Sequence, residues 1–186
     1  ILVSIERLKS YPNSQILFLT PTKPLASQIE KEFLNNTDIE KVVVLTGEVA
    51  PVKREELIKN SIVIISTPQT IANDIVNSRI DLKNFSLLVL DEAHRCVKDY
   101  DYTWISSQYH KISKYARIVG LTASPGSDKE KIKEVCKNAF IERIEMKTQE
   151  DEDVKAYVQE VKVDWIKVDL PEELKEIKEY FDICFN

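Results

Sequence analysis

Glycine is scarce in this sequence. The 186 residues contain only Gly47, Gly120 and Gly126, and none of the three is followed by lysine. A phosphate-binding loop of the form G-x-x-x-x-G-K-[ST] needs glycines and a lysine in fixed register, because its backbone closes around the phosphates and the lysine neutralises them. A loop of this kind is therefore excluded from these residues.

Long apolar runs and paired cysteines are also lacking. No apolar run approaches the roughly 20 residues that span a membrane, and the first residues show no signal-peptide pattern. Cys96, Cys136 and Cys184 are odd in number and widely spaced, which favours neither a disulfide framework nor a zinc site. We therefore expect no membrane partner and a reducing, cytoplasmic (intracellular) setting.

The composition is that of an ordinary globular domain. Apolar residues make up 43% and charged residues 31%, and the length is sufficient for a proper core. The net charge of −5 argues against a surface coated in basic residues. It leaves room for a local phosphate-binding track, because backbone N–H groups and a few lysines can make such contacts.

The most informative stretch runs from Phe85 to His94. Five apolar residues, interrupted only by Ser86, lead directly into Asp91 and Glu92. The run predicts a strand that is buried on both faces, with the two carboxylates at the sheet edge where parallel sheets bind ligands. Such a pair can hold Mg²⁺ and orient a water for attack on phosphate. The alternative is a helix start, with Asp91 as the cap and Glu92 facing the helix dipole.

Strand and helix patterns alternate along the chain. Strands are predicted at 15–19, 42–45, 61–65, 85–90, 116–121 and 141–144, and helical patterns at 1–8, 22–34, 51–60, 68–76, 102–116 and 129–138. This alternation predicts a parallel α/β sheet with right-handed crossovers. Polar clusters follow five of the strands directly, so we expect all five clusters along one rim of the sheet.

The composition changes near Lys147. We expect residues 1–146 to form the α/β domain and residues 147–186 to contain an acidic linker, a strand and the start of a helical segment. The strand is predicted from the alternation of Val161, Val163 and Trp165 with charged residues, and the helix follows Pro171. Because the sequence starts and stops within helical patterns, we expect a fragment of a longer protein.

Five motifs in register support a family resemblance. The segments P-T-K-P-L-A-S-Q, L-T-G-E, T-P-Q-T, D-E-A-H and L-T-A-S-P-G resemble those of the first RecA-like domain of a DEAH-type superfamily 2 helicase. They are most similar to those of the archaeal Hef, Fanconi anaemia group M and RIG-I-like helicases. The resemblance covers roughly Ile1 to Ile144 and implies a three-layer RecA-like fold with a mostly parallel sheet. It also implies ATP and Mg²⁺ as cofactors and a second RecA-like domain in the full-length protein.

The resemblance also implies roles for particular residues. Asp91 matches the residue that holds Mg²⁺ through water, and Glu92 matches the one that orients or deprotonates the attacking water. His94, Thr122 and Ser124 match residues that line the nucleotide site and connect it to strand separation. The matches to nucleic-acid-contacting motifs are Pro21, Thr22, Lys23, Gln28, Thr46, Gly47, Glu48, Thr67, Pro68 and Gln69. Plain helix capping is the alternative for the threonines among them.

The implied function is that of an ATP-dependent helicase or translocase acting on forked or branched DNA. An RNA-directed RIG-I-like helicase remains open, because both kinds of enzyme contact the nucleic-acid backbone. A nucleic-acid-binding module without ATPase activity is the alternative from another class. The family's phosphate-binding loop would lie just before Ile1, so these 186 residues are expected to start after it and to hydrolyse no ATP by themselves.

Overall fold

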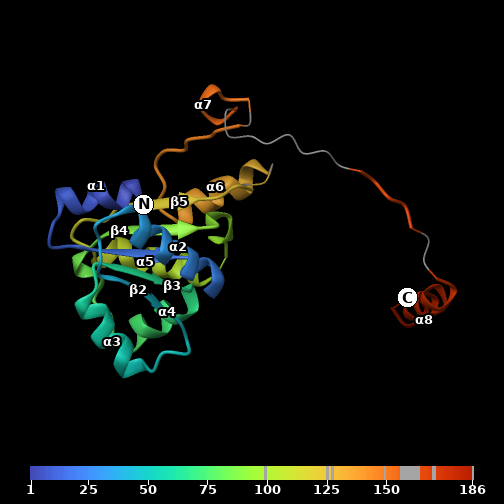
Figure 1. Ribbon diagram of the computed structural model, residues 1–186, viewed down its shortest axis with the longest axis horizontal. Helices are drawn as coiled ribbons and strands as arrows, with labels where there is room; N and C mark the ends of the chain where they lie inside the picture. The colour runs from blue at the N-terminus through green and yellow to red at the C-terminus, as the bar shows by residue number, and fades with distance from the viewer. Residues whose placement is uncertain are drawn as a thin grey trace. The chain divides into compact units, whose positions relative to one another are not determined.

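Five parallel strands form the central sheet of the structure (Figure 1). The computed structural model describes residues 1–98, 100–124, 126, 128–148, 150–155, 164–168 and 171–185. The chain divides into two units, Ile1–Ile144 and Glu145–Asn186, of which the first contains the sheet. The strands are β1 (Gln15–Leu19), β2 (Val42–Leu45), β3 (Val63–Ser66), β4 (Phe85–Asp91) and β5 (Ile118–Leu121).

The strand order is β2-β3-β1-β4-β5, so the chain crosses over the sheet between strands. β1 pairs with β3 on one side and with β4 on the other, where Leu19 lies opposite Leu90. β4 in turn pairs with β5, and Asp91 lies opposite Leu121. This arrangement confirms the parallel α/β fold that the alternating patterns predict.

Helices connect the strands and cover both faces of the sheet (Figure 1). They are α1 (Leu2–Ser10), α2 (Lys23–Asn36), α3 (Pro51–Asn60), α4 (Pro68–Val76), α5 (Asp101–Ile112) and α6 (Lys129–Asn138), with short 3₁₀ helices η1 (Leu82–Asn84) and η2 (Ala93–Arg95). Proline lies in the first turn of α2, α3 and α4, where its missing N–H has no helical partner to lose.

The core consists of two layers, one on each side of the sheet. Successive strand residues point to opposite faces, so Leu17 and Leu19 belong to the layer that contains buried residues of α3, α4 and α5. Ile16 and Phe18 belong to the other layer, where Phe33 of α2 packs edge-on against Phe18. Because β1, β3 and β4 are buried on both faces, their sequences read as continuous apolar runs.

The prediction of a strand at 141–144 is wrong. Phe140 has a left-handed backbone (φ 53°), and the amide of Ile141 donates to the carbonyl of Cys136 at 2.8 Å. The amide of Phe140 also donates to the carbonyl of Lys137, which completes a Schellman motif at the end of α6. The alternating pattern after Phe140 therefore begins as a helix terminus, and residues 141–144 lie in no strand.

The second unit contains two helices among its described residues, α7 (Glu152–Lys155) and α8 (Glu172–Phe185). α8 confirms the helical pattern predicted after Pro171. The predicted strand at Val161 and Val163 lies outside the described residues. Trp165 lies in neither a helix nor a strand, and it is 93% exposed.

Candidate functional site

The polar clusters predicted to share a rim do lie at one edge of the sheet. Each of them follows the carboxyl end of a strand, and all five strands run in the same direction. In the spatial order of the strands, the clusters are Thr46–Glu48 after β2, Thr67–Gln69 after β3, Thr20–Lys23 after β1, Asp91–His94 at the end of β4 and Thr122–Ser124 after β5. The acidic cluster therefore lies next to the hydroxyl cluster.

The acidic pair lies at a sharp change of backbone direction. Asp91 is the last residue of β4, whose six preceding residues are all buried. Glu92 has a left-handed backbone, with φ 53° and ψ 48°. A residue with a Cβ adopts this conformation at a cost of about 1–3 kcal/mol, and such outliers concentrate at functional sites. The reversal ends the strand and begins η2, so the alternative of an α-helix capped by Asp91 is wrong.

Two residues outside the motifs hold Asp91 in place. The hydroxyl of Thr20 donates to Oδ2 of Asp91 over 3.3 Å, and the hydroxyl of Tyr102 donates to its backbone carbonyl over 2.8 Å. Both donors are fully buried. Burial raises the pKa of Tyr102 above its ordinary value, and the negative charge of Asp91 raises it further, so the phenol remains a donor. Thr20 and Tyr102 thus fix the side chain and the main chain of Asp91.

Glu92, His94 and Thr122 form a connected group. Oε2 of Glu92 is buried and has no hydrogen-bond partner, although it lies 3.2 Å from Nδ1 of His94. The same Nδ1 lies 2.9 Å from the hydroxyl oxygen of Thr122, which also accepts the backbone N–H of Ser124 over 3.2 Å. The imidazole therefore connects the carboxylate that follows β4 with the hydroxyl that follows β5.

Gly120 allows this connection to form. A Cβ placed on Gly120 would lie 2.9 Å from the Cβ of Ala93, which is closer than real Cβ contacts come. The D-E-A-H turn therefore packs directly onto the backbone of β5, one residue pair away from Asp91 and Leu121. This close approach explains why a glycine interrupts an otherwise apolar strand.

The other three clusters form the predicted nucleic-acid side of the rim. Thr22 and Thr67 occupy the N-cap positions of α2 and α4, yet neither side chain makes a capping hydrogen bond. The hydroxyl of Thr67 is instead hydrogen-bonded to that of Thr70, at 3.0 Å. Both threonines therefore hold the N-cap position without a side-chain capping bond, and their hydroxyls do not satisfy the first N–H groups of either helix.

Burial divides the predicted contact residues into two groups. Those exposed at the surface are Thr22, Lys23, Gln28, Gly47, Glu48 and Gln69. Thr46 and Pro68 are buried, and proline has no N–H to donate. Pro21 and Thr67 are half-buried.

Lys23 and Glu48 form an ion pair across two of these clusters. Both side chains are more than half exposed, at 52% and 74%. The pair joins the start of α2 to the turn after β2, while the hydroxyl of Ser66 at the end of β3 donates to the carbonyl of Leu45 at 2.7 Å. The turn after β2 is thus tied to both neighbouring elements of the rim.

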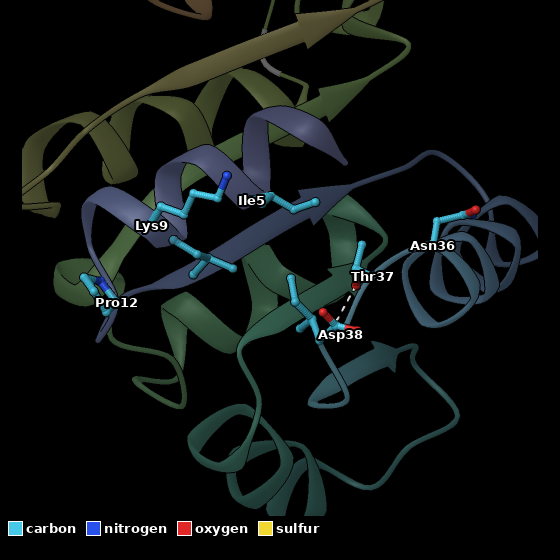
Figure 2. Close-up of a pocket in the computed structure, with 8 residues that line it drawn as sticks. Ile5, Lys9, Pro12, Asn36, Thr37 and Asp38 are labelled. Carbon is cyan, nitrogen blue, oxygen red and sulfur yellow. Dashed lines mark hydrogen bonds between the residues drawn. The ribbon is translucent and has the colours of Figure 1, made fainter.

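Figure 2 shows the residues that line a separate groove, whose volume is about 480 Å³. It is bordered by Ile5 and Lys9 of α1, by Pro12, and by Thr37 and Asp38 of the segment that follows α2. These segments precede β1 and β2, so the groove lies toward the amino ends of the strands, opposite the polar clusters.

The described residues contain no cluster of three or more potential metal ligands, and within them no helix has the length and apolar character needed to cross a membrane.

The fold and the order of polar clusters along its rim define a RecA-like α/β domain. Residues 1–132 match the DEAD/DEAH box helicase family, and the chain belongs to that family. The crystal structure of the Pyrococcus furiosus Hef helicase domain superposes with a TM-score of 0.80 and is 43% identical, over 96% of this chain and 38% of that one. The predicted relationship to Hef-type superfamily 2 helicases is thereby confirmed.

Two relatives with curated names are also similar. A putative ATP-dependent RNA helicase of Methanocaldococcus jannaschii is 42% identical over 88% of this chain, and the ATP-dependent DNA helicase MPH1 of Pyricularia oryzae is 37% identical over 91%. The chain spans only 21% and 16% of the lengths of these two proteins. It therefore corresponds to one part of a much longer enzyme in each case.

Proposed function

We propose that this chain is the first RecA-like domain of an intracellular ATP-dependent helicase or translocase that acts on forked or branched DNA. Residues 1–146 would form the domain and residues 147–186 the connection to the next segment, with a second RecA-like domain elsewhere in the protein. One observation carries the proposal: Glu92 and Thr122, from the ends of neighbouring strands, meet through the imidazole of His94 beside the fixed Asp91.

The acidic pair fits the hydrolysis of Mg-ATP. Asp91 offers one oriented carboxylate for Mg²⁺, held through water, and the bound metal would neutralise charge on the phosphates. Oε2 of Glu92 is a buried acceptor without a hydrogen-bond partner. The Glu92 side chain as a whole is 34% exposed, so its carboxylate can still accept a hydrogen bond from a water and orient it for attack, and we assign Glu92 the role of water-orienting group or base.

A change in the bound nucleotide would alter the contacts of three further residues and so reach the rest of the rim. These residues are His94, Thr122 and Ser124. Nδ1 of His94 lies close to both the Glu92 carboxylate and the Thr122 hydroxyl, and a hydroxyl can donate or accept. A change in the partners of Glu92 during hydrolysis would therefore change which group the imidazole faces.

The clusters after β1, β2 and β3 would contact the nucleic acid. Lys23 offers a charge, and the starts of α2 and α4 offer N–H groups that the side chains of the N-cap threonines leave unbonded. Contacts of this type bind phosphates and do not read bases. A DNA substrate is favoured by the similarity to MPH1, whereas the name of the archaeal relative favours RNA as the second candidate.

The test uses the longer helicase that we propose contains this chain. ATP hydrolysis and strand separation are measured with forked DNA, forked RNA and no nucleic acid. Stimulated hydrolysis with DNA unwinding supports the proposal, and selective stimulation by RNA supports the second candidate. Nucleic-acid binding by a wild-type protein that hydrolyses no ATP would instead identify a binding module.

A further inference from the structure

Arg54 of α3 and Asp74 of α4 form a buried ion pair that the proposed chemistry does not use. Their side chains are 7% and 0% exposed. Nε of Arg54 donates to Oδ2 of Asp74 and Nη2 donates to Oδ1, each over 2.7 Å. The hydrogen bonds to Asp74 raise the pKa of the guanidinium above its ordinary value, so Arg54 remains a charged donor.

The third nitrogen of the guanidinium binds a turn of the rim. Nη1 of Arg54 donates to the carbonyl oxygen of Val49. The amide of Val49 donates to the carbonyl of Thr46 over 3.1 Å, which closes the turn that exposes Gly47 and Glu48. The turn Thr46–Val49 is therefore held in place from the protein interior by the buried side chain of Arg54.

The carboxylate end of the pair is equally fixed. Arg79 donates to Oδ1 of Asp74 over 3.3 Å, and its backbone N–H donates to the Asp74 carbonyl over 2.8 Å. Asp74 belongs to α4, which begins at Pro68 directly after β3. Because a helix of nine residues is a rigid body, fixing Asp74 also fixes the start of α4 relative to the turn after β2.

Stability alone does not call for charges at this position. Burying two charges carries a large desolvation penalty, and apolar residues of similar volume are often as stable or more stable. An apolar pair, however, could not hold the carbonyl of Val49. The fork of an arginine can bind both oxygens of Asp74 and still have a nitrogen for a third acceptor.

We propose that the Arg54–Asp74 pair is a positioning device that sets the spacing between two phosphate-contacting points of the rim. These points are the turn Thr46–Val49 and the first residues of α4. The pair touches no ligand itself, and it acts by holding backbone groups at a fixed separation along a nucleic-acid strand. This inference rests on the proposed nucleic-acid-binding function.

The principal test is Arg54→Lys in the longer helicase. Lysine keeps a cation beside Asp74, but a single ammonium lacks the planar fork that reaches both carboxylate oxygens and the Val49 carbonyl together. We expect the concentration of single-stranded DNA for half-maximal stimulation of ATP hydrolysis to rise about fivefold to tenfold, as for the loss of one or two hydrogen bonds to phosphate. Hydrolysis without DNA, and the rate at saturating DNA, should remain at the wild-type value.

A second variant separates positioning from folding. Arg54→Met combined with Asp74→Asn removes both charges at nearly constant volume, and the asparagine can still accept from Arg79. Its urea midpoint should stay near that of the wild type while its DNA requirement rises as in Arg54→Lys. A cooperative unfolding curve is measured for both variants alongside the DNA titration.

The outcomes distinguish a failure of this inference from a failure of the proposed nucleic-acid-binding function. If either folded variant needs no more DNA than the wild type, the pair has only a structural role and the inference is overturned. If both variants fail to fold, the pair is a stability element and the inference is likewise overturned. If the wild-type helicase itself binds no nucleic acid, the proposed function fails, and this inference fails with it.

Discussion

Nδ1 of His94 lies 2.9 Å from the hydroxyl oxygen of Thr122, although 28 residues separate them in the sequence. The contact exists because β4 and β5 are neighbouring strands and because Gly120, which has no Cβ, allows the D-E-A-H turn to pack closely against β5. It joins two motifs that the sequence presents as separate turns.

Replacing Glu92 with glutamine should cripple ATP hydrolysis and leave nucleotide binding nearly intact. The amide keeps the shape of the side chain but can no longer act as a base, a loss that typically costs roughly 10²–10⁴-fold in rate. Phosphate release and nucleotide affinity are measured in the longer helicase. Hydrolysis at the wild-type rate would remove Glu92 from the mechanism. The 186-residue chain by itself, which lacks G-x-x-x-x-G-K-[ST], serves as the background control.

Thr20→Val should weaken the response to Mg²⁺, because valine has the shape of threonine but cannot donate to Asp91. The hydrogen bond is long, at 3.3 Å, so we expect less than the roughly 1.5–3 kcal/mol of a good bond to a charged group, namely about 1 kcal/mol or a fivefold rise in half-saturating Mg²⁺. Thr20→Ser keeps the donor and is the matched control. The Mg²⁺ titration of ATP hydrolysis is accompanied by Mn²⁺ binding measured by electron paramagnetic resonance. Equal titrations for valine and serine would show that the contact does not orient Asp91.

Gly120→Ala should destabilise the domain by about 1–3 kcal/mol, the usual range for overpacking a well-packed site. The added methyl group would lie 2.9 Å from Cβ of Ala93 and would push the D-E-A-H turn away from β5. Urea unfolding measures the effect. Gly47→Ala is the control, since a Cβ at Gly47 has no other atom within 4 Å and its backbone is not left-handed. A similar midpoint for both variants would mean that the turn yields without strain.

Glu48→Gln should strengthen binding of single-stranded DNA. The carboxylate of Glu48 pairs with Lys23 and repels phosphate, so removing its charge frees the lysine for the nucleic acid. Exposed ion pairs contribute about 0.2–1 kcal/mol, which predicts a gain in affinity of up to about fivefold at low salt. Fluorescence anisotropy with a labelled oligonucleotide measures the dissociation constant.

Glu55→Gln provides the control for Glu48→Gln. It makes the same change in net charge and also frees a lysine, Lys59, at the end of α3 away from the rim. We expect little change in DNA affinity for this variant. Weaker DNA binding by Glu48→Gln would show that the carboxylate contacts the nucleic acid directly, as the family resemblance implies.

The sequence predicts the sheet and the rim well because both follow from short-range patterns. The apolar run before Asp91 and the polar residues after each strand mark strand ends, and parallel topology places those ends together. The same reasoning could have placed Thr20 at the rim beside Asp91, because Thr20 follows the strand that pairs with β4. Its position could have been recognised from the strand order, but that order depends on tertiary packing.

Other features leave no readable pattern in the sequence. Arg54 and Asp74 are 20 residues apart on two different helices, and each by itself resembles a solvent-exposed charge. Tyr102 reaches the carbonyl of Asp91 only because α5 packs back against β4. The strand expected at 141–144 fails for a related reason. Its alternation is short, and a left-handed Phe140 determines the local backbone where a glycine would be the usual signal.

β1 lies between β3 and β4, so it is the strand of the described sheet at which the three strands followed by the predicted nucleic-acid contacts (β2, β3 and β1) meet the two strands followed by the Glu92 and Thr122 clusters. Neighbouring strands lie only about 4.8 Å apart. Thr20 spans that gap with a single hydroxyl, one residue before the turn that leads to Lys23. In a helicase with this arrangement, a single hydrogen bond would connect the proposed site of ATP hydrolysis with the proposed nucleic-acid contacts.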